Sequence, residues 1–263
     1  MENNSSKRFA IVTGASSGIG YAFAEQLIKR GYNLLIVSNV PEIEEAAKKL
    51  SVISDQLSVV PLMMDLGQQS SARELYEYTR AHKMEVEVLV NNAGVYHDKD
   101  ILDDSEGFTS LIMNLHMYTP AMLCYLFGQD MRARGKGYIL NVCSVTAKMA
   151  AQRLGTYGGT KAFLAHFTRA LHIELRKYGV KVTNVSPGAV DTGLYSISPA
   201  LTKLGKCLGI IVSPQTLARR GLFALFHGWP KTTVPTVFWQ VLCFLILLAP
   251  TCLLRLIRRL GWF

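Results

Sequence analysis

A tyrosine and a lysine stand four residues apart in the stretch Y-G-G-T-K, from Tyr157 to Lys161. If this stretch is helical, both side chains project from one face, because residues i and i+4 are neighbours on a helix. Two interpretations are open: a solvated surface pair, or a phenol that donates a proton beside an ammonium that tunes it. A free phenol has a pKa of about 10, so proton donation near neutral pH requires a lower value. An ammonium fixed in a poorly hydrated cleft can supply such a shift.

A glycine-rich stretch near the start of the chain has the composition of a phosphate-binding turn. It runs from Thr13 to Gly20 and reads T-G-A-S-S-G-I-G. Its glycines allow a tight turn and a close approach to a ligand, and the N-terminus of the helix that follows favours a pyrophosphate. A plain tight turn is the alternative for this stretch alone. A second small-residue stretch, N-N-A-G from Asn91 to Gly94, ends a central strand and leaves room for a ligand.

Short apolar runs alternate with amphipathic stretches from residue 8 to residue 190. This alternation predicts βαβ units in one doubly wound α/β domain, whose parallel sheet has helices on both faces. Asp65, after the third strand, is open to two interpretations, an acceptor for an adenine amine or a helix cap. The expected strands are Phe9–Thr13, Asn33–Ser38, Leu57–Met64, Val86–Asn91, Tyr138–Cys143 and Val180–Val185. The expected helices are Gly18–Arg30, Pro41–Leu50, Ser70–His82, a long region at about 105–134, and Tyr157–Tyr178.

The charge of the chain is concentrated in its last quarter. The 263 residues carry 28 Lys and Arg against 19 Asp and Glu, and no acidic residue follows Asp191. This quarter is also the most apolar, which favours a membrane surface over nucleic acid as its partner. The five cysteines show no C-x-x-C spacing and no adjacent His cluster. This pattern argues against a metal site and favours reduced thiols in a cytosolic setting.

The motifs, taken in order, resemble those of the short-chain dehydrogenase/reductase family. They are the glycine-rich turn, N-N-A-G, an Asn in the next helix, a Ser thirteen residues before Y-x-x-x-K, and S-P-G-A-V-D-T, all within about residues 8–195. The resemblance implies a Rossmann fold in which Tyr157 protonates a carbonyl oxygen as hydride arrives. It implies that Ser144 hydrogen-bonds that oxygen and that Lys161 holds the nicotinamide ribose and lowers the phenol pKa. It implies that Asn114 holds a water linking Lys161 to solvent.

The resemblance also implies a nicotinamide cofactor. NAD-dependent members place an acidic residue after the second strand, whereas this chain has Ser38 and Asn39 there, and Ser17 where many NADP-dependent members have a basic residue. No carboxylate repels a 2′-phosphate and no arginine clamps it, so we expect NADP(H) over NAD(H). The implied cofactor-binding residues are Thr13, Gly14, Ser16, Ser17, Gly18, Ile19, Gly20, Ser38, Asn39, Asp65, Leu66, Asn92, Ala93, Gly94, Tyr157, Lys161, Pro187, Gly188, Val190 and Thr192.

The end of the chain carries the predictions about substrate and membrane. We expect residues 1–233 to form the catalytic domain, with a substrate segment at about 193–228 and an apolar, basic extension at 234–263. The substrate segment is apolar, which favours a lipophilic substrate; packing against the core is the alternative. Between Pro235 and Pro250 the apolar helix has 14 residues, about 21 Å, which is short of a bilayer core of about 30 Å.

Arg255, Arg258 and Arg259 follow this apolar run on one helical face. Such a pattern predicts a monotopic or hairpin-like association with the cytoplasmic face of a membrane. A single span and a helix buried against the sheet or a second subunit are the alternatives. By resemblance, we also expect a homodimer or homotetramer formed through the helices around 115–133 and 157–177.

The leading functional hypothesis is an NADP(H)-linked ketoreductase acting on a long-chain 3-oxoacyl or 3-ketosphinganine type of substrate. A soluble steroid or polyol dehydrogenase of the same family is one alternative. A non-catalytic nucleotide-binding sensor or assembly protein is the alternative from another class. The complete set of catalytic positions argues against the last, because a protein without catalysis has no need of all four: Asn114, Ser144, Tyr157 and Lys161.

Overall fold

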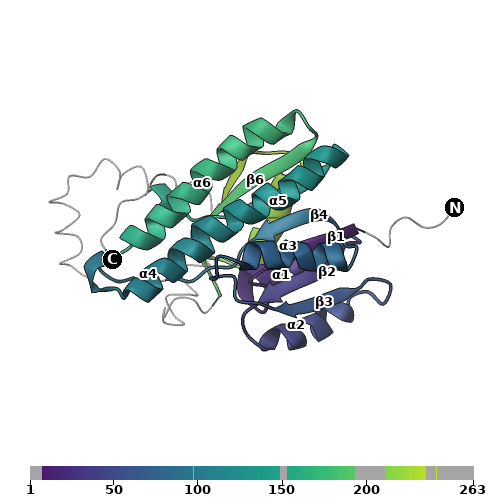
Figure 1. The fold of residues 1–263 in the computed structure, drawn as a ribbon, viewed down its shortest axis with the longest axis horizontal. Coiled ribbons are helices and arrows are strands. Elements are labelled where there is room, and N and C mark those ends of the chain that lie inside the picture. Colours follow the sequence, from purple (N-terminus) through teal and green to yellow (C-terminus); the bar gives the residue numbers. More distant parts are fainter. Residues whose placement is uncertain (1–7, 97, 149–152, 193–210, 235–240, 242–263) are drawn as a thin grey trace.

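The computed structural model describes residues 8–96, 98–148, 153–192, 211–234 and 241. A seven-stranded parallel sheet lies at its centre in the order β3-β2-β1-β4-β5-β6-β9 (Figure 1), and β7 pairs with β8 in a small second sheet. The strands are β1 (Arg8–Thr13), β2 (Asn33–Ser38), β3 (Val59–Met63), β4 (Glu85–Asn91), β5 (Gly137–Val142), β6 (Val180–Pro187), β7 (Ala189–Val190), β8 (Ile211–Val212) and β9 (Lys231–Val234). The helical elements are α1 (Gly18–Ile28), α2 (Glu42–Ser51), α3 (Ser71–Ala81), η2 (Ile101–Asp103), α4 (Glu106–Met113), η3 (Asn114–Tyr118), α5 (Thr119–Arg134), η4 (Val145–Lys148), α6 (Gly155–Arg176) and α8 (Pro214–Phe226).

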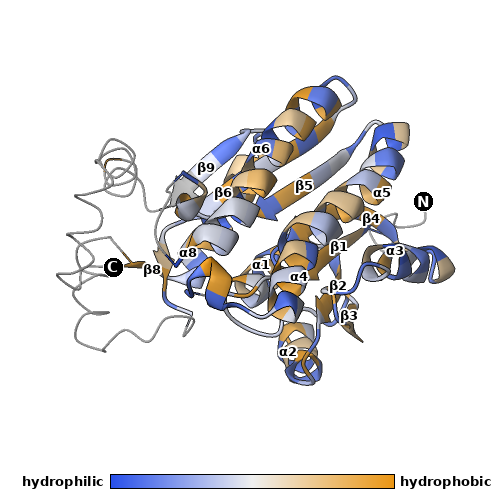
Figure 2. Cartoon of the chain, turned by 60° about the vertical axis from the view of Figure 1, so that its left-hand side comes forward, coloured by the Kyte–Doolittle hydropathy of each residue, from blue (hydrophilic) through white to orange (hydrophobic). Residues whose placement is uncertain are grey.

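Each face of the sheet packs against its own set of helices. Ala10 and Val12 of β1 belong to the apolar core that contains residues of α1, α2 and α8. Ile11, between them, belongs to the core that contains residues of α3, α5 and α6. This alternation follows from the two-residue period of a strand. Strand β2 is buried along its whole length, and Figure 2 shows apolar residues on the strands and on the sides of helices that face them.

The strand order reverses at β1, which pairs with β2 on one side and with β4 on the other. In open parallel sheets a ligand binds outside the carboxyl ends of the strands at this switch point. Thr13, Asn91 and Val142 are the last residues of β1, β4 and β5. The segments that follow these strands therefore begin at the same edge of the sheet, and they include most of the predicted site residues.

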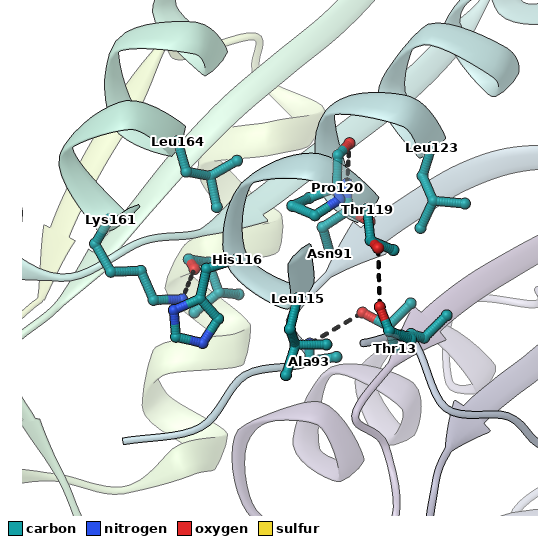
Figure 3. Close-up of a pocket in the computed structure, with 12 residues that line it drawn as sticks. Thr13, Asn91, Ala93, Leu115, His116, Thr119, Pro120, Leu123, Lys161 and Leu164 are labelled. Atoms are coloured by element: carbon teal, nitrogen blue, oxygen red, sulfur yellow. Dashed lines mark hydrogen bonds between the residues drawn. The ribbon is translucent and has the colours of Figure 1, made fainter. Parts of the chain in front are cut away.

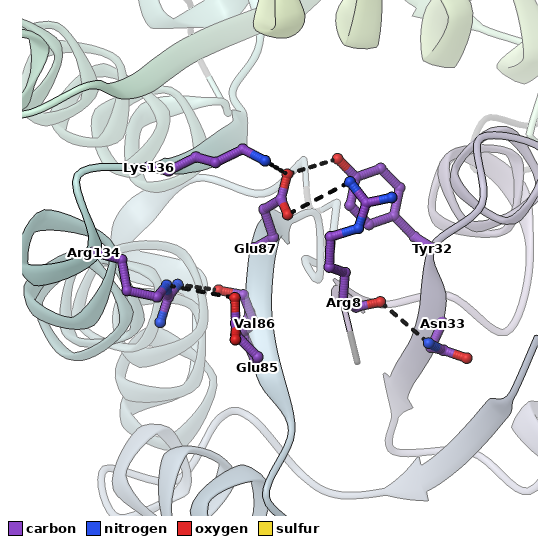
Figure 4. A network of polar contacts seen from close by, with 8 residues as sticks. All are labelled: Arg8, Tyr32, Asn33, Glu85, Val86, Glu87, Arg134 and Lys136. Atoms are coloured by element: carbon purple, nitrogen blue, oxygen red, sulfur yellow. Dashed lines mark hydrogen bonds and ion pairs between the residues drawn. The ribbon is translucent and has the colours of Figure 1, made fainter. Parts of the chain in front are cut away.

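A buried carboxylate joins several elements near the opposite end of β4 (Figure 4). Glu87 accepts a hydrogen bond from the hydroxyl of Tyr32 at 3.1 Å and pairs with Nζ of Lys136 at 3.1 Å. Arg8 lies 3.9 Å from the other carboxylate oxygen. Burial, followed by the charge of Glu87, raises the pKa of the Tyr32 phenol. This network connects β1 and β4 with the residues just before β2 and β5, at the end of the strands away from the predicted site.

The predicted doubly wound sheet with helices on both faces is confirmed. Each expected strand and helix is present, with ends shifted by a few residues. The long helical region expected at about 105–134 contains a π-helical turn, η3, in which the N–H of Thr119 donates to the carbonyl oxygen of Asn114. Strand β9 is an element that the sequence does not predict, because Lys-Thr-Thr-Val has neither the length nor the alternation of a typical strand.

The predicted extension at 234–263 lies outside the described residues except at Val234 and Val241, and the substrate segment is described only from Ile211 onward. Among the described residues, no helix is both long and apolar enough to cross a bilayer. The domain division at residue 233 and the membrane association stay predictions.

Candidate active site

The glycine-rich turn between β1 and α1 is folded closely on itself and against β2. Gly14 and Gly18 have φ angles of 64° and 57°, in the left-handed region that glycine adopts without steric cost. The N–H of Gly14 donates to the carbonyl oxygen of Val37 at 2.7 Å. A Cβ atom on Gly20 would lie 2.0 Å from the carbonyl oxygen of Gly14, so only glycine fits there.

The N-N-A-G segment after β4 holds this turn in place. Nδ2 of Asn92 donates to the carbonyl oxygens of Thr13 at 2.9 Å and Gly14 at 3.1 Å. The N–H groups of Asn92 and Ala93 donate to Oγ1 of Thr13 at 2.9 and 3.0 Å. Figure 3 shows Thr13 and Ala93 side by side. The two stretches that the sequence assigns to cofactor binding are therefore packed as one unit.

The residues expected around the adenosine differ in exposure. Ser38 is buried at the end of β2, and its hydroxyl donates to Oγ of Ser16 at 3.2 Å. Ser17 is the N-cap residue of α1, but its side chain makes no capping hydrogen bond, and it is exposed. Asn39 is exposed as well. Ser17 and Asn39 thus present hydrogen-bonding groups to a ligand more openly than Ser38 does.

Asp65 organises the turn that follows β3. Its Oδ1 accepts from the N–H of Gly67 at 2.9 Å, and its Oδ2 accepts from Nε2 of Gln68 at 3.0 Å. The adjacent Leu66 is buried, and its carbonyl oxygen accepts from Oγ1 of Thr119 at 2.8 Å. Asp65 therefore stabilises the turn after β3. Its carboxylate has further lone pairs that can accept hydrogen bonds from a ligand.

Tyr157 and Lys161 lie in the first turns of α6 and are buried, with exposed fractions of 9% and 5%. Nζ of Lys161 lies 5.9 Å from the centre of the Tyr157 ring and donates to the carbonyl oxygen of Val142 at 3.1 Å. Burial lowers the pKa of Lys161 because it penalises the charged form. The two residues are thus an interior pair, not a solvated pair on a helix surface.

Ser144 follows β5 and is buried beside this pair. Its Oγ accepts from the N–H of Thr146 at 3.2 Å and from the hydroxyl of Thr146 at 2.8 Å. Because Thr146 is the donor in both bonds, the Ser144 proton is left to donate elsewhere. Ser144 also lines the same cleft as Tyr157 and Lys161.

One cleft, with an open volume of about 530 Å³, brings together residues from six parts of the chain: the start of α1, the loop after β4, η3, the end of β5, α6 and the loop after β6. The predicted residues that line it are Ile19, Asn92, Gly94, Ser144, Tyr157, Lys161, Pro187, Gly188, Val190 and Thr192. A smaller cavity beside it is lined in part by Thr13, Leu66, Ala93 and Lys161 (Figure 3). The predicted residues that line neither space are Gly14, Ser16, Ser17, Gly18, Gly20, Ser38, Asn39, Asp65 and Asn114.

His116 is a residue of this cleft that the sequence analysis did not identify. It lies on η3, is 1% exposed, and lines both the cleft and the smaller cavity. Asn114, the predicted residue of this segment, opens η3, is half-buried and lines neither space. The sequence gives one hint that His116 belongs to the site: it is two residues after Asn114, within the helical region expected at about 105–134.

The turn fits the pyrophosphate of a dinucleotide on geometric grounds. Helix α1 begins at Gly18, within the glycine-rich stretch, and its first turn contains no acidic residue. Its unpaired N–H groups and dipole therefore favour an anion. A Cβ on Gly14 would lie 2.8 Å from Cα of Ala93, so no side chain fits at this position and the backbone of the turn stays accessible to a ligand.

Comparison with known proteins agrees with this geometry. A family profile described as short chain dehydrogenase matches residues 8–199. The chain belongs to the short-chain dehydrogenase/reductase family.

Three relatives show how the family likeness extends beyond the motifs. The very-long-chain 3-oxoacyl-CoA reductase of Podospora anserina is 30% identical over 238 residues, which are 86% of this chain and 67% of that protein. The human protein named inactive hydroxysteroid dehydrogenase-like protein 1 is 30% identical over 89% of this chain and 69% of its own length. The chicken hydroxysteroid dehydrogenase-like protein 1 is 31% identical, and the match spans only 60% of its length.

Solved structures share the fold. The bulky-bulky ketone specific alcohol dehydrogenase of Comamonas testosteroni superposes with a TM-score of 0.75 at 26% identity and covers 89% of this chain and 90% of its own. A short-chain dehydrogenase of Sphingobium yanoikuyae, solved with NADPH, has a TM-score of 0.78 at 24% identity, with 89% and 92% of the two chains covered.

Proposed function

We propose that this protein is an NADP(H)-dependent ketoreductase that interconverts a carbonyl and a secondary alcohol of a lipophilic substrate, of the long-chain 3-oxoacyl or 3-ketosphinganine type. The observation that carries the proposal is the convergence of Ser144, Tyr157 and Lys161 on one cleft. Ile19 and Thr192 line the same cleft, so it extends to the start of α1, where the phosphate-binding turn ends.

The chemistry follows from the roles that these groups can take. When bound, the nicotinamide cofactor supplies the hydride that reduces the carbonyl carbon. Ser144 donates its hydroxyl proton in a hydrogen bond to the carbonyl oxygen and so polarises the C=O bond. Tyr157 transfers its phenolic proton to that oxygen, which completes the alcohol and leaves a phenolate. The ammonium of Lys161 stabilises that phenolate, because opposite charges attract strongly in a poorly hydrated site.

Two features support NADP(H) over NAD(H). Ser17 and Asn39 are exposed, and they lie on the two segments that the Gly14–Val37 hydrogen bond joins. Neither carries the negative charge that would repel a 2′-phosphate. The structure in complex with NADPH, from Sphingobium yanoikuyae, has the same fold. A comparison of NADPH and NADH as substrates tests this preference directly.

Three observations support a lipophilic substrate. The relative from Podospora anserina is named a reductase of very-long-chain 3-oxoacyl-CoA, and the solved structure from Comamonas testosteroni is named for bulky ketones. The substrate segment at 193–228 is largely apolar in sequence. We expect activity to rise with chain length across a series of 3-oxoacyl thioesters.

We also infer assembly into a homodimer or homotetramer and contact with the cytoplasmic face of a membrane. Exposed apolar side chains on α5 and α6 support the first: Tyr125 is 58% exposed, Phe163 42% and Ile173 69%. The apolar, basic sequence of 234–263 supports the second. Chain mass in solution by light scattering tests the first, and partition into anionic vesicles before and after truncation at Val234 tests the second.

The decisive experiment is consumption of NADPH with a panel of long-chain 3-oxo lipids by the parent protein and a Tyr157→Phe variant. Phenylalanine keeps the ring, whose edges meet the rings of Tyr96 and His116 with centroids 5.3 and 5.7 Å away. Loss of a general acid lowers the rate by roughly 10²–10⁴-fold. Equal rates for the parent and the variant would refute the role of Tyr157 as proton donor. If the parent does not turn over any of these lipids, the proposed function is wrong.

A further inference from the structure

His116 is a buried side chain that connects three parts of the cleft. Its Nε2 accepts a hydrogen bond from the N–H of Val95 at 3.0 Å, in the loop after β4. Its Nδ1 lies 3.1 Å from Oγ1 of Thr160, on α6. The hydroxyl of Thr160 donates in turn to the carbonyl oxygen of Tyr157 at 2.8 Å. A continuous chain of hydrogen bonds therefore runs from the loop after β4, through η3, to the turn of α6 that carries Tyr157.

The direction of each bond fixes the protonation state of the imidazole. A backbone N–H can only donate, so Nε2 of His116 must carry a lone pair. The Thr160 proton is already donated to the carbonyl oxygen of Tyr157, so Nδ1 must be the donor to Oγ1 of Thr160. The ring is therefore neutral, with its proton on Nδ1. Burial, and then the charge of Lys161, lower the pKa of His116 well below its ordinary value, which agrees with a neutral ring.

The surroundings of His116 leave it little freedom. A Cβ atom on Gly94 would lie 2.8 Å from Nε2 of His116 and 3.6 Å from Nζ of Lys161, so the bare backbone of Gly94 makes room for both. The ring of His116 also meets the ring of Tyr157 edge to face, with centroids 5.7 Å apart. Figure 3 shows the imidazole directly beside the Lys161 side chain. The groups that face it are thus Lys161 and Tyr157 on α6.

The π-helical turn explains how a helix delivers the imidazole to this place. In η3 the N–H of Thr119 bonds to the carbonyl oxygen five residues earlier, on Asn114, and the turn is wider than an α-helical one. The imidazole of His116 leaves the helix inside this turn. Such turns are frequent at functional sites, because they redirect a side chain without ending the helix.

We propose that His116 is a positioning residue of the reaction: as a neutral imidazole it ties the loop after β4 to the first turn of α6 and so holds Tyr157 and Lys161 in their working arrangement. A charged ring would lose the bond from Val95 and would place a second cation against Lys161. The proposal rests on the proposed ketoreductase function for its kinetic consequence, but its geometric consequence for Tyr157 does not depend on a substrate.

The kinetic test compares His116→Phe, which keeps a ring but loses both hydrogen bonds, with His116→Asn, whose amide can still donate toward Thr160. With NADPH and a long-chain 3-oxoacyl thioester, we expect the phenylalanine variant to lose roughly 10- to 100-fold in kcat, because small misplacements of reacting groups have effects of that size. We expect KM for NADPH to stay within about threefold, since the variant leaves the glycine-rich turn intact, and the asparagine variant to recover part of kcat.

His172→Phe is the matched control. His172 is also a buried histidine, and its Nδ1 lies 2.8 Å from the carbonyl oxygen of Val182, but it is three turns beyond Lys161 on α6 and lines neither the cleft nor the smaller cavity. A merely structural role for His116 predicts that both variants lose kcat in proportion to their loss of thermal stability. Positioning predicts that only the variant at 116 loses kcat.

A second variant keeps the proposal testable if His116→Phe does not fold. Thr160→Val is close in shape and removes the middle of the hydrogen-bond chain. We expect it to lower kcat as His116→Phe does, and we expect the double variant to lose no more than either alone, because both changes break the same chain. Full activity in Thr160→Val, or strictly additive losses, overturns the proposal.

A substrate-free measurement separates this proposal from the proposed function. The tyrosinate absorbance of Tyr157 is obtained by subtracting the pH titration of Tyr157→Phe from that of the parent, and the same difference is taken in the His116→Phe background. We expect the midpoint to shift between the two backgrounds by at least about half a pH unit, and to stay in the His172→Phe background. An unchanged midpoint at 116 refutes the positioning role, whereas a shifted midpoint without turnover refutes the ketoreductase function alone.

Discussion

Replacing Gly14 with alanine separates two reasons for which a glycine can be required. Gly14 has a φ angle of 64°, and alanine in this left-handed region costs about 1–2 kcal/mol. A Cβ atom there would also lie 2.8 Å from Cα of Ala93, closer than real Cβ contacts come, and 3.0 Å from Nδ2 of Asn92, which is tight. The Ala93 contact is to backbone, so rotation of a side chain cannot relieve it. Such overpacking costs a further 1–3 kcal/mol or so.

Two other glycines of this chain isolate the first cost from the second. Gly31 and Gly135 have φ angles of 82° and 71°, and a Cβ on either would meet no atom within 4 Å. Alanine there incurs the backbone cost alone, offset by about 0.4–1 kcal/mol from the reduced freedom of the unfolded chain. We therefore expect Gly14→Ala to be less stable than Gly31→Ala and Gly135→Ala by about 1–3 kcal/mol.

The assay is urea unfolding of the three variants, together with NADPH binding followed by fluorescence. Thermal unfolding of the same variants should give the same order, since each kcal/mol corresponds to a change in melting temperature of about 2–4 °C in a protein of this size. The added Cβ atom of Gly14→Ala must displace Ala93 and Asn92, which line the two cavities of the site. Among the three variants, we therefore expect weaker NADPH binding only in Gly14→Ala, by roughly tenfold, or about 1.4 kcal/mol. If all three variants lose the same stability and bind NADPH as the parent does, the packing of the two segments does not set the cofactor site.

The remaining predictions concern the proton donor's neighbours and the fold. Ser144→Ala should lower kcat by roughly 10²–10³-fold in steady-state assays, as removal of one oxyanion donor does, whereas Thr146→Val should change it only a few-fold. Glu87→Ala should lower the free energy of unfolding in urea by about 1–3 kcal/mol, because Tyr32 loses its buried acceptor; Glu85→Ala, whose ion pair is exposed, should stay within about 1 kcal/mol. Because the pKa of His116 is lowered in the folded protein, the unfolded chain binds more protons than the folded chain just below pH 6.5. The free energy of unfolding should therefore fall as the pH drops from there toward the folded-state pKa. In urea titrations, His116→Gln should make this decline less steep.

The parts of the fold that the sequence predicts are those that depend on local patterns. Strand β2 is recognisable because N-L-L-I-V-S is apolar at successive positions, as a strand buried on both faces must be. The glycine-rich turn is recognisable because only glycine tolerates its conformation. Strand β9 is not, because its four residues become a strand only by pairing with β6, from Asn184↔Lys231 to Pro187↔Val234. That pairing is a property of the assembled sheet.

The same distinction applies to the site. Tyr157 and Lys161 can be paired from the sequence because four residues on a helix fix their relation. The relation of His116 to its partners has no such rule, since Val95 is 21 residues away and Thr160 is 44 residues away. The π-helical turn that delivers it also leaves no periodic signal. Motif order therefore indicates the proposed proton donor, Tyr157, but not the residue that we propose to hold it.

Asn91 and Asn92 show how one dipeptide joins the two halves of the site. Asn92 faces the glycine-rich turn and donates to the carbonyl oxygens of Thr13 and Gly14, whereas Nδ2 of Asn91 donates to Oδ1 of Asn141 at 2.8 Å inside the sheet. Nδ2 of Asn141 donates to Oγ1 of Thr168 on α6, also at 2.8 Å. Asn91 is the last residue of β4, and Asn92 is the first residue after it. Asn92 thus holds the turn that we propose to bind the phosphates, and Asn91 is linked through Asn141 to the helix that carries the proposed proton donor, so the end of β4 sets the separation of the two.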